Sequence, residues 1–280
     1  MWQLRNRLWH IPPAGGIMGI LNVTPDSFSD GGMHHTVDAA VEHARRMLAE
    51  GAHIIDVGGE STRPGAAPIS PQEEECRTAP VVAALRREFP QALLSIDTRH
   101  PTVAAAALRA GADIVNDISG LADPAMRALC AKHPCGIILM HMQGTPQTMQ
   151  LAPSYTDVVA EVRSFFAERV AMAQQAGIAL NRICLDPGIG FGKTTAHNLQ
   201  LIRHLAELRV HGLPILMALS RKRFMAELLQ DPALVKNSSI PTVSMSLLAA
   251  EAGACIHRVH DVAPLAQALT LRYYFHHLNP

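Results

Sequence analysis

The chain lacks an excess of charge of either sign, because its 280 residues include 24 Lys and Arg and 24 Asp and Glu. No general field attracts nucleic acid or an anionic membrane, so we expect neither partner, and an anionic ligand must be held by local groups. No apolar run approaches the ~20 residues of a membrane-spanning helix, and the N-terminus lacks the apolar core of a signal peptide.

Cysteine is scarce and odd in number, which excludes a complete disulfide framework. Most of the five cysteines lie in or beside apolar segments, as expected for reduced thiols in a cytoplasmic protein. Hydrophobic residues make up 48% of the chain, although aromatic residues make up only 4%. The chain can therefore build a large core, and its length fits an α/β barrel of about 250 residues.

A repeated unit runs through the sequence, in which a short apolar run ends in a polar loop and a helical segment follows. Apolar runs without strict alternation are typical of parallel strands that are buried on both faces. The expected strands are residues 17–21, 53–57, 92–96, 113–115, 136–140, 182–185, 214–218 and 255–259. The expected helices are residues 37–50, 71–89, 101–110, 124–133, 158–176, 199–208 and 262–274, with another that begins near residue 222.

Eight such units predict a single-domain TIM (β/α)8 barrel over residues 1–280. A doubly wound open sheet usually has fewer strands, and no change in composition marks a second domain. Residues 228–252 are too long for one helix, and Pro232 and Pro241 interrupt them. We therefore expect an extra helix before the last strand.

Polar residues follow every expected strand, and in a barrel these strand ends face the same side. A single Asn or Asp at such a position commonly caps the next helix or turn, but Lys, Arg and His near the mouth of a barrel are not explained in that way. The strand-end residues are Asn22, Thr62, Arg63, Asp97, Asn116, His141, Asp186, Ser220, Arg221, Lys222, Arg258 and His260.

These residues divide into two chemical sets. One set could surround a flat heterocycle, because a carboxylate accepts from an amino–imino edge while an amide and an ammonium meet carbonyl and ring nitrogens. This set is Asp97, Asn116, Asp186 and Lys222. The other set could hold a polyanion such as diphosphate, with the amide oxygen of Asn22 also offered to Mg²⁺. It contains Asn22, Arg63, Arg258 and His260.

Two other motifs are rejected. Gly192-Lys193-Thr194 ends like a P-loop, but Pro187 occupies the position of the first glycine, so a nucleotide triphosphatase is not favoured. Cys130, His133 and Cys135 are metal-ligand types, yet they lie at the helix-to-strand end of their unit and have no fourth partner nearby. We interpret these two cysteines as structural thiols.

Several longer blocks together are specific for one family. The chain resembles bacterial dihydropteroate synthase over nearly its whole length. The blocks that carry the resemblance are residues 18–32, 56–65, 116–117, 140–144, 186–193, 220–222 and 258–262. The first of these reads Met-Gly-Ile-Leu-Asn-Val-Thr-Pro-Asp-Ser-Phe-Ser-Asp-Gly-Gly and the second Asp-Val-Gly-Gly-Glu-Ser-Thr-Arg-Pro-Gly. The resemblance implies a TIM barrel that joins 6-hydroxymethyl-7,8-dihydropterin diphosphate to 4-aminobenzoate, releases diphosphate, and is a target of sulfonamides.

By the same resemblance, Asn22 binds Mg²⁺ and diphosphate, and Arg63, Arg258 and His260 complete the anion site. The pterin is bound by Asp97, Asn116, Asp186 and Lys222. The aminobenzoate pocket is formed by Thr62, Pro64, Phe28, Phe191 and the backbone after Lys222, and the first two loops close over the substrates. The family commonly forms homodimers. This chain departs from many relatives at Arg223, where they have Ser, and at residues 238–242.

The leaving group dictates the expected mechanism. An electron-rich dihydropterin stabilises a cation at its exocyclic carbon, so the C–O bond breaks ahead of attack if positive charge neutralises the departing diphosphate. The arylamine is neutral at pH 7 and requires no strong base, so we expect no catalytic triad. The residues expected to act in catalysis are Asp97, Lys222, Arg258 and His260.

Two alternatives belong to other classes. A pterin-binding methyltransferase barrel would share the pterin pocket, but it has no use for Arg63 and Arg258 at a diphosphate. A non-catalytic pterin-binding protein would be expected to lack Asn22, Lys222 or Arg258, and all three are present.

Overall fold

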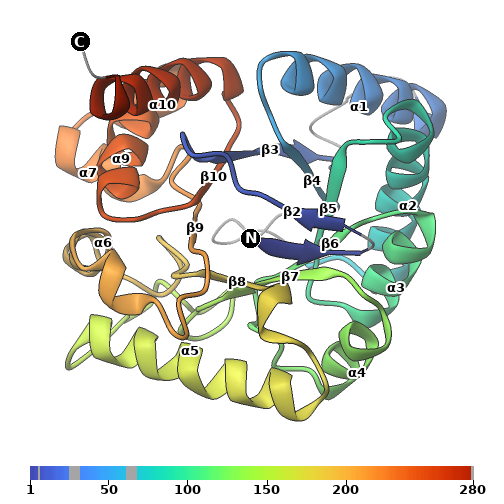
Figure 1. Cartoon of the computed structure of the whole chain (residues 1–280), viewed down its shortest axis with the longest axis horizontal. Helices are drawn as coiled ribbons and strands as arrows, with labels where there is room; N and C mark the ends of the chain where they lie inside the picture. The colour runs from blue at the N-terminus through green and yellow to red at the C-terminus, as the bar shows by residue number, and fades with distance from the viewer. Residues whose placement is uncertain (6, 25–31, 61–67, 279–280) are drawn as a thin grey trace.

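The computed structural model describes residues 1–5, 7–24, 32–60 and 68–278, and within them it confirms the predicted barrel. Eight parallel strands follow one another in the order β8-β7-β6-β5-β4-β3-β10-β9. A parallel bridge between Leu185 and Ile215 joins the two outer strands, so the sheet closes (Figure 1). The strands are β3 (Gly16–Asn22), β4 (Ile54–Gly58), β5 (Leu93–Asp97), β6 (Ile114–Asp117), β7 (Gly136–Met140), β8 (Ile183–Asp186), β9 (Leu216–Met217) and β10 (Ile256–Val259).

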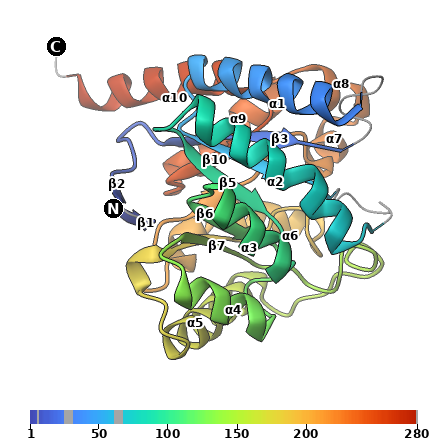
Figure 2. The same ribbon diagram turned by 90° about the vertical axis from the view of Figure 1, so that its right-hand side faces the viewer.

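Helices surround this barrel on all sides (Figures 1 and 2). Several begin at polar capping residues, since Ser70, Asp123 and Asp157 accept hydrogen bonds from the first backbone N–H groups of their helices. Within the described ranges, no helix is both long enough and apolar enough to cross a bilayer. The helices are α1 (Gly32–Ala49), α2 (Pro71–Glu88), α3 (Pro101–Ala110), α4 (Pro124–Lys132), α5 (Val158–Gln175), α6 (Thr195–Arg203), α7 (Arg223–Leu229), α8 (Pro232–Asn237), α9 (Ile240–Glu251) and α10 (Val262–His277).

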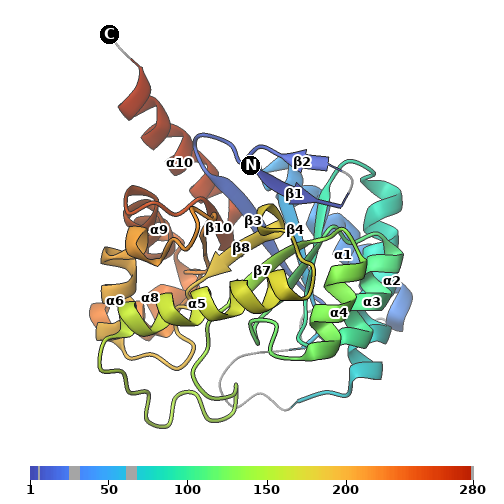
Figure 3. The ribbon, with the colours of Figure 1, turned by 60° about the horizontal axis from the view of Figure 1, so that its bottom comes forward.

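The expected extra helix before the last strand is present. The segment between β9 and β10 contains α7, α8 and α9, and the two prolines that interrupt it begin the second and third of these helices. Proline is favourable there, because the first residues of a helix have no intrahelical partner for an N–H group. At the C-terminus, α10 extends beyond the body of the barrel (Figure 3).

Strand β9 is shorter than predicted, with two residues instead of the five of residues 214–218. Its ladder with β10 pairs Leu216 with Ile256 and Met217 with His257, and the neighbouring Ile215 lies outside the strand. Ile215 forms an isolated bridge to Leu185, and its carbonyl accepts from the N–H groups of Cys255 at 2.8 Å and Ile256 at 3.2 Å. Pro214 has no N–H to donate, although its carbonyl accepts from the N–H of Leu185 at 2.9 Å. The apolar run thus predicts the position of the strand but not the length of its ladder.

An N-terminal hairpin, which the sequence pattern did not predict, covers one end of the barrel. Strands β1 (Trp2–Leu4) and β2 (Arg7–Trp9) pair antiparallel and lie across the barrel axis (Figure 1). Trp2 and Leu4 are fully buried against the first inward-facing residues of the barrel strands, among them Met18 and Ile54. The indole N–H of Trp2 also donates to the carbonyl of Arg182 at 2.8 Å. The hairpin therefore closes the amino-terminal end, and the carboxyl ends of the strands remain for a site.

Substitution Leu4→Ala is expected to destabilise the fold by about 2 to 5 kcal/mol, because it leaves a cavity between the hairpin and the barrel. The matched control is Leu8→Ala on the facing strand, where the side chain of Leu8 is 44% exposed. Urea unfolding followed by circular dichroism measures both. Equal midpoints for Leu4→Ala and the wild type would show that the hairpin does not stabilise the barrel.

Candidate active site

The carboxyl ends of four neighbouring strands place the predicted polar residues in one row. Asn22 of β3 pairs in register with Gly58 of β4, Gly58 with Asp97 of β5, and Asp97 with Asn116 of β6. Because Gly58 has no side chain, the Asn22 amide and the Asp97 carboxylate approach each other across it. A β-carbon at Gly58 would lie 3.8 Å from Asn22 Oδ1 and 3.7 Å from Asp97 Oδ2.

Arg258 crosses the barrel mouth and forms two short ion pairs. Its Nε donates to Asp56 Oδ2 and its Nη2 donates to Asp97 Oδ2, both at 2.6 Å. Burial disfavours the charged guanidinium, but Asp56 and Asp97 outweigh it and raise the pKa of Arg258. Arg258 is therefore permanently charged, and it is held between strands β4 and β5.

Asp56 belongs to this site, although we did not predict it. It is fully buried, and it also accepts from Asn116 Nδ2 at 3.1 Å, while its Oδ1 has no hydrogen-bond partner among the described residues. The sequence did contain a signal, since Asp56 is the one charged residue inside the apolar run 53–57. A carboxylate within a buried strand must be paired, and its position two residues after Ile54 turns it toward the barrel interior.

Asp186 and Lys222 lie at the other side of the mouth, together with Phe191. Asp186 Oδ1 accepts from the N–H of Gly188 at 2.7 Å, and Lys222 Nζ lies 4.3 Å from the centre of the Phe191 ring. Burial raises the pKa of Asp186, whereas the Gly188 N–H and Lys222 lower it. The pKa of Lys222 is lowered to about 8, because burial lowers the pKa by more than the nearby Asp186 raises it. Each group thus supports the charge of the other.

Asp97 experiences opposing influences. Burial raises its pKa to about 7, Arg258 lowers the pKa, and the nearby Asp56 and Asp186 raise it again. Carboxylates from β4, β5 and β8 thus present several hydrogen-bond acceptors at the mouth, beside the cations Arg258 and Lys222. Such a surface favours a ligand edge that donates hydrogen bonds or carries positive charge.

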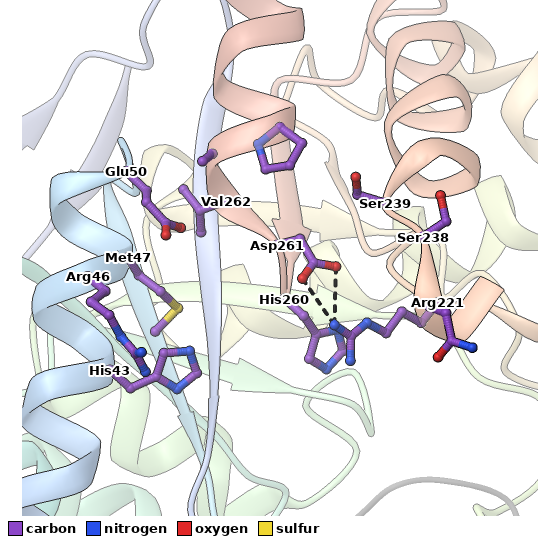
Figure 4. Close-up of a pocket in the computed structure, with 13 residues that line it drawn as sticks. His43, Arg46, Met47, Glu50, Arg221, Ser238, Ser239, His260, Asp261 and Val262 are labelled. Atoms are coloured by element: carbon purple, nitrogen blue, oxygen red, sulfur yellow. Dashed lines mark hydrogen bonds and ion pairs between the residues drawn. The ribbon is translucent and has the colours of Figure 1, made fainter. Parts of the chain in front are cut away.

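His260 connects the mouth to a cavity of about 490 Å³ beside the barrel (Figure 4). Its Nδ1 lies 2.9 Å from the hydroxyl of Ser220. The cavity wall contains Arg46 of α1, and an ion pair between Arg221 and Asp261 joins the loops that follow β9 and β10. Loops after the last two strands commonly form an anion site in this fold, and the cationic side chains here agree with that chemistry.

Four predicted residues cannot be placed. Phe28, Thr62, Arg63 and Pro64 lie outside the described residues, and the structure therefore tests neither the anion role of Arg63 nor most of the aminobenzoate pocket. The predicted residues that the structure does bring to one end of the barrel are Asn22, Asp97, Asn116, Asp186, Phe191, Lys222, Arg258 and His260. Their roles remain predictions.

Two places could hold a cation. Asn22 offers an amide oxygen at the mouth, and Mg²⁺ commonly takes one or two protein oxygens and completes its shell with phosphate and water. Among the described residues, Glu60, Glu74 and His100 form a second group, with one ligand atom each within 4.8 Å of the others. Glu60 already pairs with Arg99 at 3.4 Å, so this second group is partly neutralised.

The rejected motif at Cys130, His133 and Cys135 lies around the side chain of Arg182. The side chain of Arg182 donates to the carbonyls of Cys135 at 2.8 Å and of Cys130 at 2.6 Å, and both cysteines are buried free thiols. The arginine satisfies backbone carbonyls below the barrel, far from the strand ends that carry the polar residues.

The comparisons with known proteins agree with this geometry. Residues 18–260 match the family described as pterin binding enzyme. The chain is 47% identical over 253 residues to the dihydropteroate synthase of Escherichia coli (strain K12), which covers 90% of this chain and 89% of that protein. The Yersinia pestis dihydropteroate synthase, solved with a sulfonamide drug, has a TM-score of 0.91 at 44% identity and covers 99% of this chain and 100% of that one. The Xanthomonas albilineans enzyme in complex with 7,8-dihydropteroate has a TM-score of 0.84 at 43% identity, with 95% of each chain covered.

Glu74 generates a prediction about pH. Its side chain is 1% exposed, and burial raises its pKa from 4.5 to about 7, although the hydroxyl of Thr98 acts in the opposite direction and lowers the pKa. The folded state therefore binds this proton more tightly than the unfolded chain, and the carboxyl group destabilises the fold progressively as the pH rises from about 4.5 to about 7. Substitution Glu74→Gln is expected to stabilise the protein by about 1 to 3 kcal/mol at pH 8 and by almost nothing at pH 4.5.

Urea unfolding of the wild type and of Glu74→Gln at both pH values measures this difference. The neighbouring Glu75, which is only partly buried, offers the control Glu75→Gln, for which a smaller difference between the two pH values is expected. A stability difference for Glu74→Gln that is the same at pH 4.5 and pH 8 would contradict the assignment of a raised pKa.

Proposed function

The chain belongs to the dihydropteroate synthase family of pterin-binding enzymes, and we propose that its two substrates meet over the polar residues at the mouth of the barrel. As a dihydropteroate synthase it is a transferase of folate biosynthesis, which joins 6-hydroxymethyl-7,8-dihydropterin diphosphate to 4-aminobenzoate and releases diphosphate. The observation that carries the site proposal is that carboxylates, amides and fixed cations from different strands converge at one end of the barrel.

The pterin ring is bound by Asp97, Asn116, Asp186 and Lys222, which we name the pterin-site residues. The carboxylates accept from the amino and ring N–H groups, and the ammonium of Lys222 donates to the ring carbonyl or a ring nitrogen. The network among these residues supports the proposal, because Arg258 fixes Asp97 and the Gly188 N–H fixes Asp186 before any ligand enters. A preorganised site loses less entropy on binding.

The diphosphate is bound by Asn22, Arg258 and His260, with Arg63 from outside the described residues. Asp56 and Asp97 engage Nε and Nη2 of Arg258, and within the described part of the chain no hydrogen bond engages its Nη1. We assign Nη1 to the diphosphate. Mg²⁺ fits beside Asn22, whose amide oxygen is a hard ligand, and when bound it supplies further positive charge to the leaving group.

The reaction begins with cleavage of the C–O bond between the pterin methylene carbon and the diphosphate. Arg258 and His260 stabilise the negative charge that develops on the leaving oxygen, and the carboxylate of Asp97 stabilises the positive charge that spreads over the pterin. The neutral amine of 4-aminobenzoate then attacks the methylene carbon and loses a proton to water or diphosphate. Attack therefore needs no strong base.

The aminobenzoate pocket lies between Phe191 and the backbone after Lys222, with Phe28, Thr62 and Pro64 as further members outside the described residues. Arg223, where relatives commonly have Ser, is 83% exposed and pairs with Glu227 at 3.0 Å, so its side chain does not occupy the mouth. The Yersinia pestis relative was solved with a sulfonamide drug, and we extend sulfonamide binding to this pocket.

The remaining assignments concern the whole protein. All described strands except the hairpin belong to one barrel, which supports a single domain over residues 1–280. The five free thiols support a cytoplasmic location.

Large apolar side chains are exposed on α9 and α10, among them Leu248, Leu271 and Phe275, which supports a homodimer that buries this face.

Substitutions Lys222→Ala and Asp186→Asn are each expected to lower kcat/KM by several kcal/mol of transition-state stabilisation, because each removes a charged hydrogen-bond partner of the pterin. Steady-state kinetics with dihydropterin diphosphate as the varied substrate measures the effect. Lys132→Ala, an exposed lysine at the end of α4, is the control. Near-normal kinetics in either site variant would refute the pterin assignment.

Substitution Asn22→Ala is expected to raise the Mg²⁺ concentration needed for half-maximal activity by about tenfold or more, since one hard oxygen ligand is lost. A titration of activity against Mg²⁺ at saturating substrate measures the shift. Gln143→Ala, which removes another amide near the mouth, is the comparison variant. An unchanged titration curve for Asn22→Ala would exclude Asn22 as a metal ligand.

A further inference from the structure

Lys193 is a buried cation that the proposed function does not use. Its side chain is 3% exposed, and among the described residues no carboxylate lies within ion-pair distance of its ammonium. Burying a lysine is costly unless its N–H groups are satisfied. Its contacts therefore require an explanation.

The ammonium of Lys193 is surrounded by acceptors from two adjacent loops. Nζ lies 2.9 Å from His141 Nδ1 at the end of β7, and it donates to the carbonyl oxygens of Gly188 at 3.0 Å and Phe191 at 2.9 Å. These three contacts join the end of one strand to both halves of the loop that follows β8.

Both carbonyls belong to residues that contact the pterin-site residues. The N–H of Gly188 donates to Asp186 Oδ1, and the ring of Phe191 lies under Lys222 Nζ. Lys193 thus holds Gly188, which orients the carboxylate of Asp186, and it also holds Phe191, whose ring supports the ammonium of Lys222. We propose that Lys193 is a positioning residue, which holds the loop 187–192 so that Asp186 and Lys222 face the pterin; this inference rests on the pterin site proposed above.

One backbone hydrogen bond spans the loop, from the N–H of Phe191 to the carbonyl of Gly188 at 3.0 Å, and side chains add further constraints. Gly188, Gly190 and Gly192 all have positive φ, at 65°, 82° and 63°, and such a run of left-handed glycines has high entropy when it is unconstrained. The middle of the loop is fixed separately, because Asn198 Oδ1 accepts from the Gly190 N–H at 2.9 Å. Lys193 supplies the corresponding constraint on either side of Gly190.

The contact set remains satisfied whether Lys193 is charged or neutral. Burial lowers its pKa to about 7, whereas Asp186 raises the pKa and Lys222 lowers it. The ammonium donates to both carbonyls and to the lone pair of His141 Nδ1. The neutral amine donates to the carbonyls and accepts a hydrogen bond from His141 Nδ1–H in the other tautomer. The positioning role therefore persists across neutral pH.

The test compares two ligands that occupy different halves of the site. Isothermal calorimetry measures the binding of 6-hydroxymethyl-7,8-dihydropterin and, separately, of diphosphate with Mg²⁺. Lys193→Met keeps the length and apolar body of the side chain but removes its donors. We expect this variant to bind the pterin at least tenfold more weakly and diphosphate within about twofold of the wild type, with a matching rise in the KM for dihydropterin diphosphate.

Leu4→Ala is the control for a protein that is merely less stable, because Leu4 lies at the opposite end of the barrel. It is expected to bind both ligands as the wild type does. If Lys193→Met does not fold, Lys193→Gln keeps one amide donor and is expected to give an intermediate loss of pterin affinity.

Wild-type pterin affinity in Lys193→Met, or equal losses of both ligands, would overturn the proposal. Asp186→Asn is measured in parallel, and unchanged pterin affinity in that variant would overturn the pterin site itself. A loss in Asp186→Asn without a loss in Lys193→Met would leave the site in place and refute only the role of Lys193.

Discussion

The double ion pair of Arg258 with Asp56 and Asp97 is the interaction on which the rest of the site depends. A guanidinium inside a barrel requires partners, and removing it would leave the carboxylates of Asp56 and Asp97 buried without this cation. The pair fixes three strands relative to one another, since its members come from β4, β5 and β10. It also determines the character of the mouth, because two carboxylates surround one cation there.

In the site that we propose, this constraint lets one end of the barrel serve two substrates of opposite character. We assign the carboxylates of Asp97 and Asp186 to the donor edge of the pterin, with Lys222 beside them. We assign Arg258 and His260 to the anionic leaving group. The bond that breaks in the proposed reaction then lies between these two groups of residues.

The sequence predicts most of the barrel because its strand and helix signals agree at every level. Buried apolar runs, prolines at helix starts and glycines at helix ends all point to the same unit, repeated eight times. The hairpin at Trp2–Trp9 was not predicted, since three-residue strands are too short to show a period, and they form only because the end of the barrel must be covered. The convergence of the strand-end residues was also predicted, because in a barrel the carboxyl ends of all strands face the same side.

What the sequence could not provide is the set of partners inside the mouth. Asp56 lies in the middle of a strand, so a search of strand ends does not include it, although its charge in an apolar run was visible. In the sequence, Lys193 belongs to the segment that ends like a P-loop. Its proposed positioning role depends on contacts with His141 and with backbone carbonyls, which no residue pattern encodes. Every residue has a backbone carbonyl, so the sequence does not show which carbonyls accept a hydrogen bond from Lys193.

The most direct measurement of the central claim follows diphosphate release from dihydropterin diphosphate and Mg²⁺, with and without 4-aminobenzoate. If both substrates meet in one opening that favours the arylamine over water, release should depend on 4-aminobenzoate, with one diphosphate for each dihydropteroate formed. Release at the same rate without 4-aminobenzoate would contradict the account, because the pterin cation would then be captured by water.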